Sequence, residues 1–180
     1  MTNRNELDNI AIPILDSIAQ EAQNQWSDPN SKFKKIREIQ IDKRGSFGER
    51  FFLAVLPKIF LGGQIRRINY ADGDKGKSDL EINGKKFEIK TSSLDVNQKF
   101  QNENIKKNNK NFGLLFLGVA PNALYIKFIL QSKIDFNLLH NREEQKTGAG
   151  YKWDLKPADM IEVKTIDDIK NAFINAFDKI

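Results

Sequence analysis

The sequence predicts an α/β fold, in which a mixed central β-sheet is flanked by helices. Apolar residues recur at helical spacing near both ends of the chain, whereas the middle holds short apolar or alternating segments of strand length. Asn83-Gly84 joins two of these segments, and this pair is preferred in tight hairpin turns. Helices, then strands, then a last helix are typical of a sheet covered by helices, and 180 residues fit a single domain.

The N-terminal part is expected to be helical. Residues 6–23 carry apolar side chains at near-helical spacing, which Pro13 interrupts early, and a turn cluster separates them from a short helix at 32–40. A stronger helix is expected at 47–60. Its start is indicated by Ser46 and Glu49, which have the spacing of a capping box.

The middle of the chain is expected to supply the strands, at residues 64–70, 78–82, 85–92, 112–119 and 123–130. A Gly-rich polar loop is expected at 72–77. The pattern indicates a helix at 96–104, followed by a basic, Asn-rich loop at 105–111. The chain is expected to close with an amphipathic helix at 165–178.

Composition narrows the classes of function. The net charge of +5 favours a polyanionic partner, because cationic side chains that neutralise phosphates release counterions. The absence of cysteine excludes disulfides, thiolate catalysis and Cys-ligated zinc. His140 is the only histidine, which disfavours His-based hydrolases. No apolar run is long enough for a membrane span and the first residues do not resemble a signal peptide, so we expect a cytoplasmic protein.

The hairpin around Asn83-Gly84 holds the residues that we expect to form the functional site. A two-residue turn there pairs Leu80 with Phe87 and places Asp79 opposite Glu88. Because side chains alternate along a strand, one face is apolar and packs on the core, with Leu80, Ile82, Phe87 and Ile89. The other face carries Asp79, Glu81, Lys86, Glu88 and Lys90.

Two carboxylates in this position face each other at about 5 Å between Cβ atoms, which is destabilising unless something compensates the charge. A bridging Mg²⁺ would compensate Asp79 and Glu88, and Glu81 has Lys86 as a structural partner. Lys90 could orient or deprotonate a water, or stabilise the transition state, and the residues leave both roles open. The alternative is a plain solvent-facing hairpin with alternating charges.

The strings Ser-Asp-Leu-Glu-Ile at 78–82 and Phe-Glu-Ile-Lys-Thr-Ser at 87–92 resemble the core motif of the PD-(D/E)xK nuclease superfamily. The small type II restriction endonucleases of that superfamily are the most similar, although Ser78 replaces the motif's proline. The resemblance implies a restriction-endonuclease-like core at 45–130, ordered helix, three strands, helix, strand. Residues 1–44 would be N-terminal helices, and 131–180 a DNA-contacting loop and helix.

The resemblance also implies roles for individual residues. Asp79 and Glu88 would bind the metal together with the carbonyl of Ile89, Lys90 would assist the water, and Glu49 would support the site. The implied activity is cleavage of double-stranded DNA by a homodimer with Mg²⁺, for which Mn²⁺ substitutes. Two alternatives remain: a structure-selective nuclease such as a Holliday junction resolvase, and a non-catalytic DNA-binding subunit.

Candidate DNA contacts lie around this motif and in two basic loops. They are Lys43, Arg44, Ser46, Thr91, Ser92, Gln98, Lys106, Lys107, Asn108, Asn109, Arg142, Lys146 and Lys152. The alternative for each loop is an ordinary solvated segment. Trp153, at the end of the second loop, is expected to anchor that loop to the core.

Overall fold

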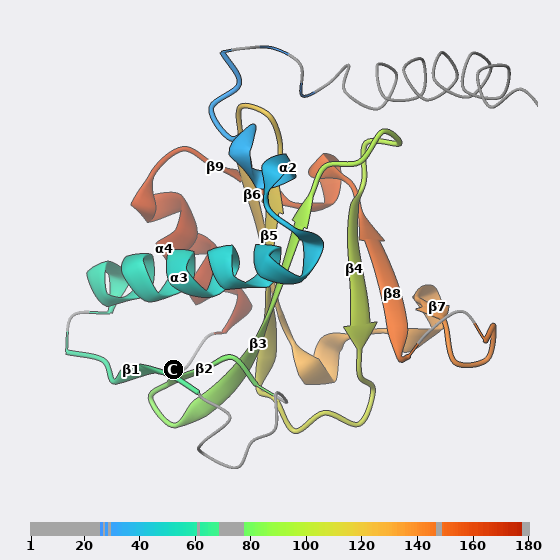
Figure 1. Ribbon diagram of the computed structural model, residues 1–180. Coiled ribbons are helices and arrows are strands. Elements are labelled where there is room, and N and C mark those ends of the chain that lie inside the picture. Colours follow the sequence, from blue (N-terminus) through green and yellow to red (C-terminus); the bar gives the residue numbers. More distant parts are fainter. Residues whose placement is uncertain are drawn as a thin grey trace, which may run out of the picture.

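The computed structural model describes residues 26, 28, 30–60, 62–68, 78–146 and 149–177. The helix expected at 6–23 and the Gly-rich loop at 72–77 lie outside the described residues. In the rest, helices cover one face of a mixed central sheet and a smaller sheet lies beside its other face (Figure 1). The predicted α/β class with a mixed sheet is therefore confirmed.

The central sheet has six strands in the order β1-β2-β3-β5-β6-β9. Their bounds are Ile65–Arg67, Leu80–Ile82, Lys85–Ser93, Gly113–Val119, Leu124–Leu130 and Ile161–Val163. Strands β3 and β5 pair in parallel, whereas the other neighbours are antiparallel. All of β5 is buried because it is covered on both faces.

Two helices cover one face of this sheet. They are α3 (Ile41–Ile59) and α4 (Ile166–Ala176), and α2 (Lys35–Glu38) is a short helix before them. Aromatic rings join the layers: Phe173 of α4 packs against Phe60, which follows α3, and against Phe87 and Phe128 of the sheet. Thr165 caps α4 in a capping box with Asp168.

Helix α3 begins earlier than the sequence indicated. Its N-cap is Gln40, without a side-chain capping bond, so Ser46 lies inside the helix and the expected capping box is wrong. The boundary expected between residues 44 and 45 also falls inside α3. The Gly45 that suggested a helix start costs only about 1 kcal/mol within a helix, which packing of the apolar face outweighs.

A three-stranded sheet, ordered β4-β8-β7, covers the other face. Its strands are Phe100–Ile105, Tyr151–Leu155 and His140–Asn141. The ring of Phe100 lies against Gly118 of β5, and Trp153 packs on Phe116 with ring centroids 5.4 Å apart. Trp153 thus anchors its segment to the core, as expected. Short 3₁₀ turns complete the chain at Gln131–Lys133, Phe136–Leu138 and Pro157–Asp159.

The helix expected at 96–104 is wrong. Instead of a helix, the chain forms a turn that begins at Asp95 and then the strand β4. The Asp95 carboxylate accepts the N–H of Lys99 at 2.8 Å in this turn. The chain forms a strand because Phe100 and Asn102 are buried on one side, and because β8 supplies a partner fifty residues later. The element order implied by the resemblance therefore fails here: β4, not a helix, connects the parallel strands β3 and β5.

No helix among the described residues is long and apolar enough to cross a membrane.

Gly48 lets α3 approach β3 closely. A Cβ at this position would lie 1.9 Å from Thr91 Oγ1 and 3.1 Å from Ile89 Cγ2. We expect Gly48→Ala to lower the free energy of unfolding by about 1–2 kcal/mol, because overpacking outweighs the gain in helix propensity. Urea unfolding followed by circular dichroism measures the change.

Gly45→Ala is the matched control on the same helix. No atom lies within 4 Å of a Cβ at Gly45, so this variant is expected to gain about 0.5–1 kcal/mol. Adding Thr91→Ala to Gly48→Ala is expected to restore much of the loss, since it removes Oγ1. A Gly48→Ala protein as stable as Gly45→Ala would contradict the close helix–sheet contact.

Candidate functional site

The hairpin has the register that the sequence predicts. Leu80 pairs with Phe87, Glu81 with Lys86 and Ile82 with Lys85. Asn83 and Gly84 both have positive φ, of 49° and 79°, as a type I′ turn requires. The four apolar side chains of the hairpin's core face, Leu80, Ile82, Phe87 and Ile89, are buried. The turn therefore delivers the polar residues of both strands to the opposite face.

The side chain of Asp79 lies against β3. The regular ladder ends at Leu80, where the N–H of Asp79 donates to the carbonyl of Phe87 at 2.8 Å. The Asp79 Oδ2 accepts the backbone N–H of Ile89 at 2.6 Å. This side-chain contact takes the place of a further backbone pair and fixes the carboxyl beside the strand that carries Glu88.

The environment of Asp79 raises its pKa to about 6. Burial is the main cause, and the negative charges of Glu88 and Glu49 add to it, while the hydrogen bond from Ile89 and the charge of Lys90 act in the opposite direction. The carboxylates of Glu88 and Glu49 are thus close enough to repel that of Asp79. Such a site favours either a proton or a cation.

Glu88 and Lys90 form an ion pair on the same face. Lys90 Nζ lies 2.6 Å from Glu88 Oε1, and both side chains are mostly buried, with 16% of the Lys90 surface and 14% of the Glu88 surface exposed. Lys90 Nζ also donates to the carbonyl of Asn104 on β4, at 3.4 Å. The ammonium group is therefore held between β3 and the second sheet.

The other two acids have basic partners. Glu49 of α3 pairs with Arg67 of β1, yet its charge still acts on Asp79. Glu81 pairs with Arg66, which donates two hydrogen bonds of 3.2 Å to the two carboxylate oxygens. Glu81 is thus occupied structurally, as expected: it pairs with Arg66 and stands opposite Lys86 on β3.

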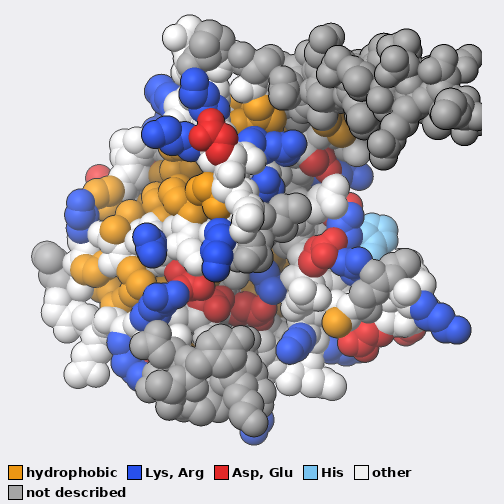
Figure 2. Space-filling view, in the orientation of Figure 1, with side chains coloured by type: hydrophobic (Ala, Val, Ile, Leu, Met, Phe, Trp, Pro, Cys, Tyr) orange, Lys and Arg blue, Asp and Glu red, His pale blue; other side chains and the backbone are white. Residues whose placement is uncertain are grey.

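A metal site here would be small. In the described part of the chain, no group of three or more His, Asp and Glu side chains is arranged to hold a metal ion. The available ligands are the carboxylates of Asp79 and Glu88 and the carbonyl of Ile89, with solvent completing the shell. This set suits Mg²⁺, which is bound through few carboxylates and keeps several waters. Figure 2 shows acidic side chains in the middle of this face, with lysines and arginines on several sides.

A cleft of about 610 Å³ opens beside Lys90, between the start of α3 and strands β3 and β4. Its cations are Arg37, Arg44 and Lys90. Arg44 Nη1 donates to Ser93 Oγ at 3.1 Å, and burial, followed by the charge of Arg37, lowers the pKa of Arg44. Two neighbouring guanidinium groups in a cleft favour an anionic ligand.

The residues expected to contact DNA on β3 and in the loops differ in their burial and in their hydrogen-bond partners. Ser92 is buried and its hydroxyl donates to Asn102, while Thr91 Oγ1 lies against α3 at Gly48. Asn109 donates to Glu88. Lys43, Gln98, Lys106, Lys107, Asn108 and Lys146 are exposed, and Ser46 is half-buried within α3.

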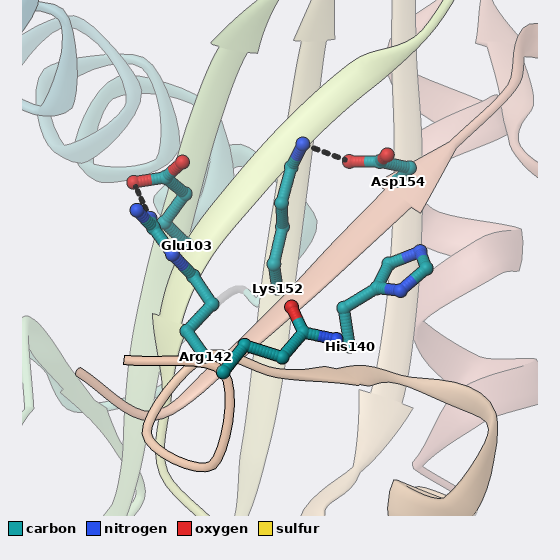
Figure 3. A pocket seen from close by; sticks show the side chains of 6 residues that line it. Glu103, His140, Arg142, Lys152 and Asp154 are labelled. Atoms are coloured by element: carbon teal, nitrogen blue, oxygen red, sulfur yellow. Dashed lines mark ion pairs between the residues drawn. The ribbon is translucent and has the colours of Figure 1, made fainter. Parts of the chain in front are cut away.

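Arg142 and Lys152 line another pocket, of about 340 Å³, on the second sheet, and Glu103 lines both this pocket and the cleft beside Lys90 (Figure 3). Arg142 pairs with Glu103 and Lys152 with Asp154. Both cations therefore have their charge compensated within the chain, and the structure does not bring them to the Asp79 site.

The structure adds residues that the sequence did not indicate. Ser78 and Asn111 are buried beside Glu88, and the carbonyl of Asn104 contacts Lys90. The Asn-rich composition of 108–111 was the only signal. From that composition the loop was expected to contact DNA. Its contact with β3 was missed, because no linear pattern shows that the loop folds back onto this strand.

Comparison with protein-family models, curated protein sequences and solved structures finds no match for this chain.

Proposed function

We propose that this chain is a Mg²⁺-dependent endonuclease that hydrolyses phosphodiester bonds of double-stranded DNA, with the chemistry of the PD-(D/E)xK nucleases. One observation carries the proposal: Asp79 and Glu88 lie close enough to repel, and Lys90 is held beside them at the edge of a cleft that also holds Arg37 and Arg44. The proposal depends on this site, since the element order departs from the superfamily's at β4.

The residues present fit a divalent cation. Asp79, Glu88 and the carbonyl of Ile89 would hold it. Burial, and after it the charges of Glu88 and Glu49, raise the pKa of Asp79, and a bound cation would offset both effects. When bound, Mg²⁺ lowers the pKa of a water ligand and stabilises charge on the phosphate. The hydrogen bond from Ile89 to Asp79 keeps the carboxylate in place before any ligand arrives.

Lys90 would act on the water or on the phosphate. Its ammonium group is oriented by Glu88 Oε1 and by the carbonyl of Asn104, so it is fixed without being neutralised by a second acid. From there it can orient or deprotonate a water, or stabilise the charge that develops on the phosphate oxygens. Glu49, held by Arg67, would support the site through its charge.

The cleft next to Lys90 would receive the DNA backbone. Arg37 and Arg44 lie along it and Lys43 is exposed at the start of the same helix, so the cations are positioned for phosphate contacts. We further propose that the enzyme is a sequence-specific type II restriction endonuclease acting as a homodimer in the cytoplasm, with Mn²⁺ able to replace Mg²⁺.

A cleavage assay tests the proposal directly. Purified protein is incubated with phage DNA, supercoiled plasmid and a four-way junction, in MgCl₂, in MnCl₂ and in EDTA. We expect discrete fragments with either metal and none with EDTA. Preferential resolution of the junction would instead identify a structure-selective nuclease. DNA binding without cleavage in any metal would overturn the nuclease proposal in favour of a DNA-binding subunit.

A further inference from the structure

A chain of hydrogen bonds links Glu88 to Ser78, the residue before Asp79, through buried side chains. Ser78 precedes Asp79, and Asn111 lies in the loop before β5; each has only 5% of its surface exposed. The hydroxyl of Ser78 donates to Asn111 Oδ1 at 2.6 Å. A buried hydrogen bond of this length, between two polar side chains, is costly to remove.

This bond decides which way the Asn111 amide points. Because Oδ1 accepts from Ser78, the Nδ2 group is turned toward Glu88 and donates to Oε2 at 3.4 Å. Asn109 Nδ2 donates to the same oxygen at 3.0 Å. Glu88 thus has two amide donors on Oε2 and the Lys90 ammonium on Oε1.

The loop that supplies these amides is itself anchored. Phe112 donates its N–H to the carbonyl of Lys86 on β3 at 2.7 Å. Gln131, after β6, donates to the carbonyl of Lys106 at 2.9 Å. The backbone N–H of Asn111 donates to Asn109 Oδ1 at 3.3 Å, which aligns the two amides. The donors are therefore fixed relative to the strand that carries Glu88.

We infer that Ser78, Asn109 and Asn111 are positioning residues, which hold the Glu88 carboxylate in one orientation for the divalent cation. The inference rests on the proposed function. Hydrogen bonds to a metal-binding carboxylate set its orientation before the metal arrives, and their loss typically weakens metal affinity or activity 10–100-fold. Ser78, at the place of the motif's proline, has the hydroxyl that proline lacks. Asn109 then serves Glu88 and does not read bases.

Metal binding by the full chain, without DNA, tests the inference. Isothermal titration calorimetry with MnCl₂ is expected to show that Ser78→Ala, Asn109→Ala and Asn111→Ala each weaken binding by about 10–100-fold. Lys110→Ala is the matched control: it changes an exposed residue between the two asparagines and is expected to retain the wild-type affinity for Mn²⁺.

A double-mutant cycle separates positioning from a general structural role. Because Ser78 acts through the Asn111 amide, Ser78→Ala is expected to cost little further Mn²⁺ affinity in an Asn111→Ala background. Asn109 is half-buried, so Asn109→Ala tests the same idea if the buried variants fail to unfold cooperatively.

The outcomes are distinguishable. Folded variants that bind Mn²⁺ as tightly as the wild type, or fully additive losses at Ser78 and Asn111, would overturn the positioning network. A wild-type protein that binds neither Mn²⁺ nor Mg²⁺ would overturn both the network and the nuclease proposal. Weakened Mn²⁺ binding in the variants, together with a wild type that cuts no DNA, would retain the network and reject the nuclease.

Discussion

Replacing Lys90 with alanine is expected to abolish DNA cleavage while the fold and DNA binding are retained. The ammonium group lies 2.6 Å from Glu88 Oε1, and its positive charge acts against the raised pKa of Asp79. A group that transfers a proton, or stabilises charge in the transition state, contributes about 10²–10⁴-fold to the rate. We expect a loss in that range.

Plasmid nicking in MgCl₂ measures the rate, and fluorescence anisotropy with labelled duplex in CaCl₂ measures binding. Lys86→Ala is the matched control, because Lys86 is exposed on the same strand and its substitution removes the same positive charge. An equal loss of cleavage in both variants would indicate general attraction of DNA. Cleavage by Lys90→Ala at the wild-type rate would remove Lys90 from the mechanism.

Asp79→Asn is expected to stabilise the metal-free protein above pH 6 and to abolish cleavage. The folded state raises the pKa of Asp79 from 3.8 to about 6, so below pH 4 the carboxyl is protonated in both folded and unfolded chains. Between pH 4 and 6 the unfolded chain ionises first, and the wild type loses stability as the pH rises. Above about pH 7 the loss is constant, on the order of 3 kcal/mol.

The side-chain amide introduced by this substitution can still accept the N–H of Ile89 but carries no charge. The difference in melting temperature between Asp79→Asn and wild type is therefore expected to be near zero at pH 4. At pH 7.5 it should reach about 6–12 °C, at roughly 2–4 °C per kcal/mol for a chain of this size. Differential scanning calorimetry across this pH range measures it. Glu144→Gln, at an exposed position, controls for net charge and is expected to show no such trend.

Adding Mg²⁺ should reverse the order of stability. A ligand that binds only the folded state adds about 2.7 kcal/mol when its concentration is 100 times its dissociation constant. We expect this gain in the wild type and not in Asp79→Asn, since the variant lacks one of the two carboxylates. An equal Mg²⁺ response in both proteins would place the metal elsewhere, and a pH-independent difference in stability would contradict the burial of Asp79.

The hairpin was predictable from the sequence because its determinants are local. Two residues of the turn set the register, and strict alternation then decides which side chains share a face. Leu80, Phe87, Glu88 and Lys90 follow from these two rules alone. The last helix was equally predictable, since its apolar spacing and the Thr165–Asp168 capping box lie within one short segment.

Residues 96–104 show where local reasoning fails. Their apolar spacing is compatible with a helix, but the partner that makes a strand favourable is β8, and sequence pattern does not reveal a partner fifty residues away. The start of α3 was mistaken for a related reason: the capping signal at Ser46 is weaker than the packing that extends the helix back to Ile41.

The sequence alone determined the α/β class, the hairpin register and the placement of Glu88 and Lys90 on one face, because turn chemistry and strand alternation act between neighbours. Tertiary structure decided what surrounds these groups. It buried Asp79 against Ile89, brought Glu49 from α3 within electrostatic range, and folded the Asn-rich loop back so that Asn109 and Asn111 donate to Glu88. These contacts join segments distant in sequence, and only packing of the whole chain brings them together.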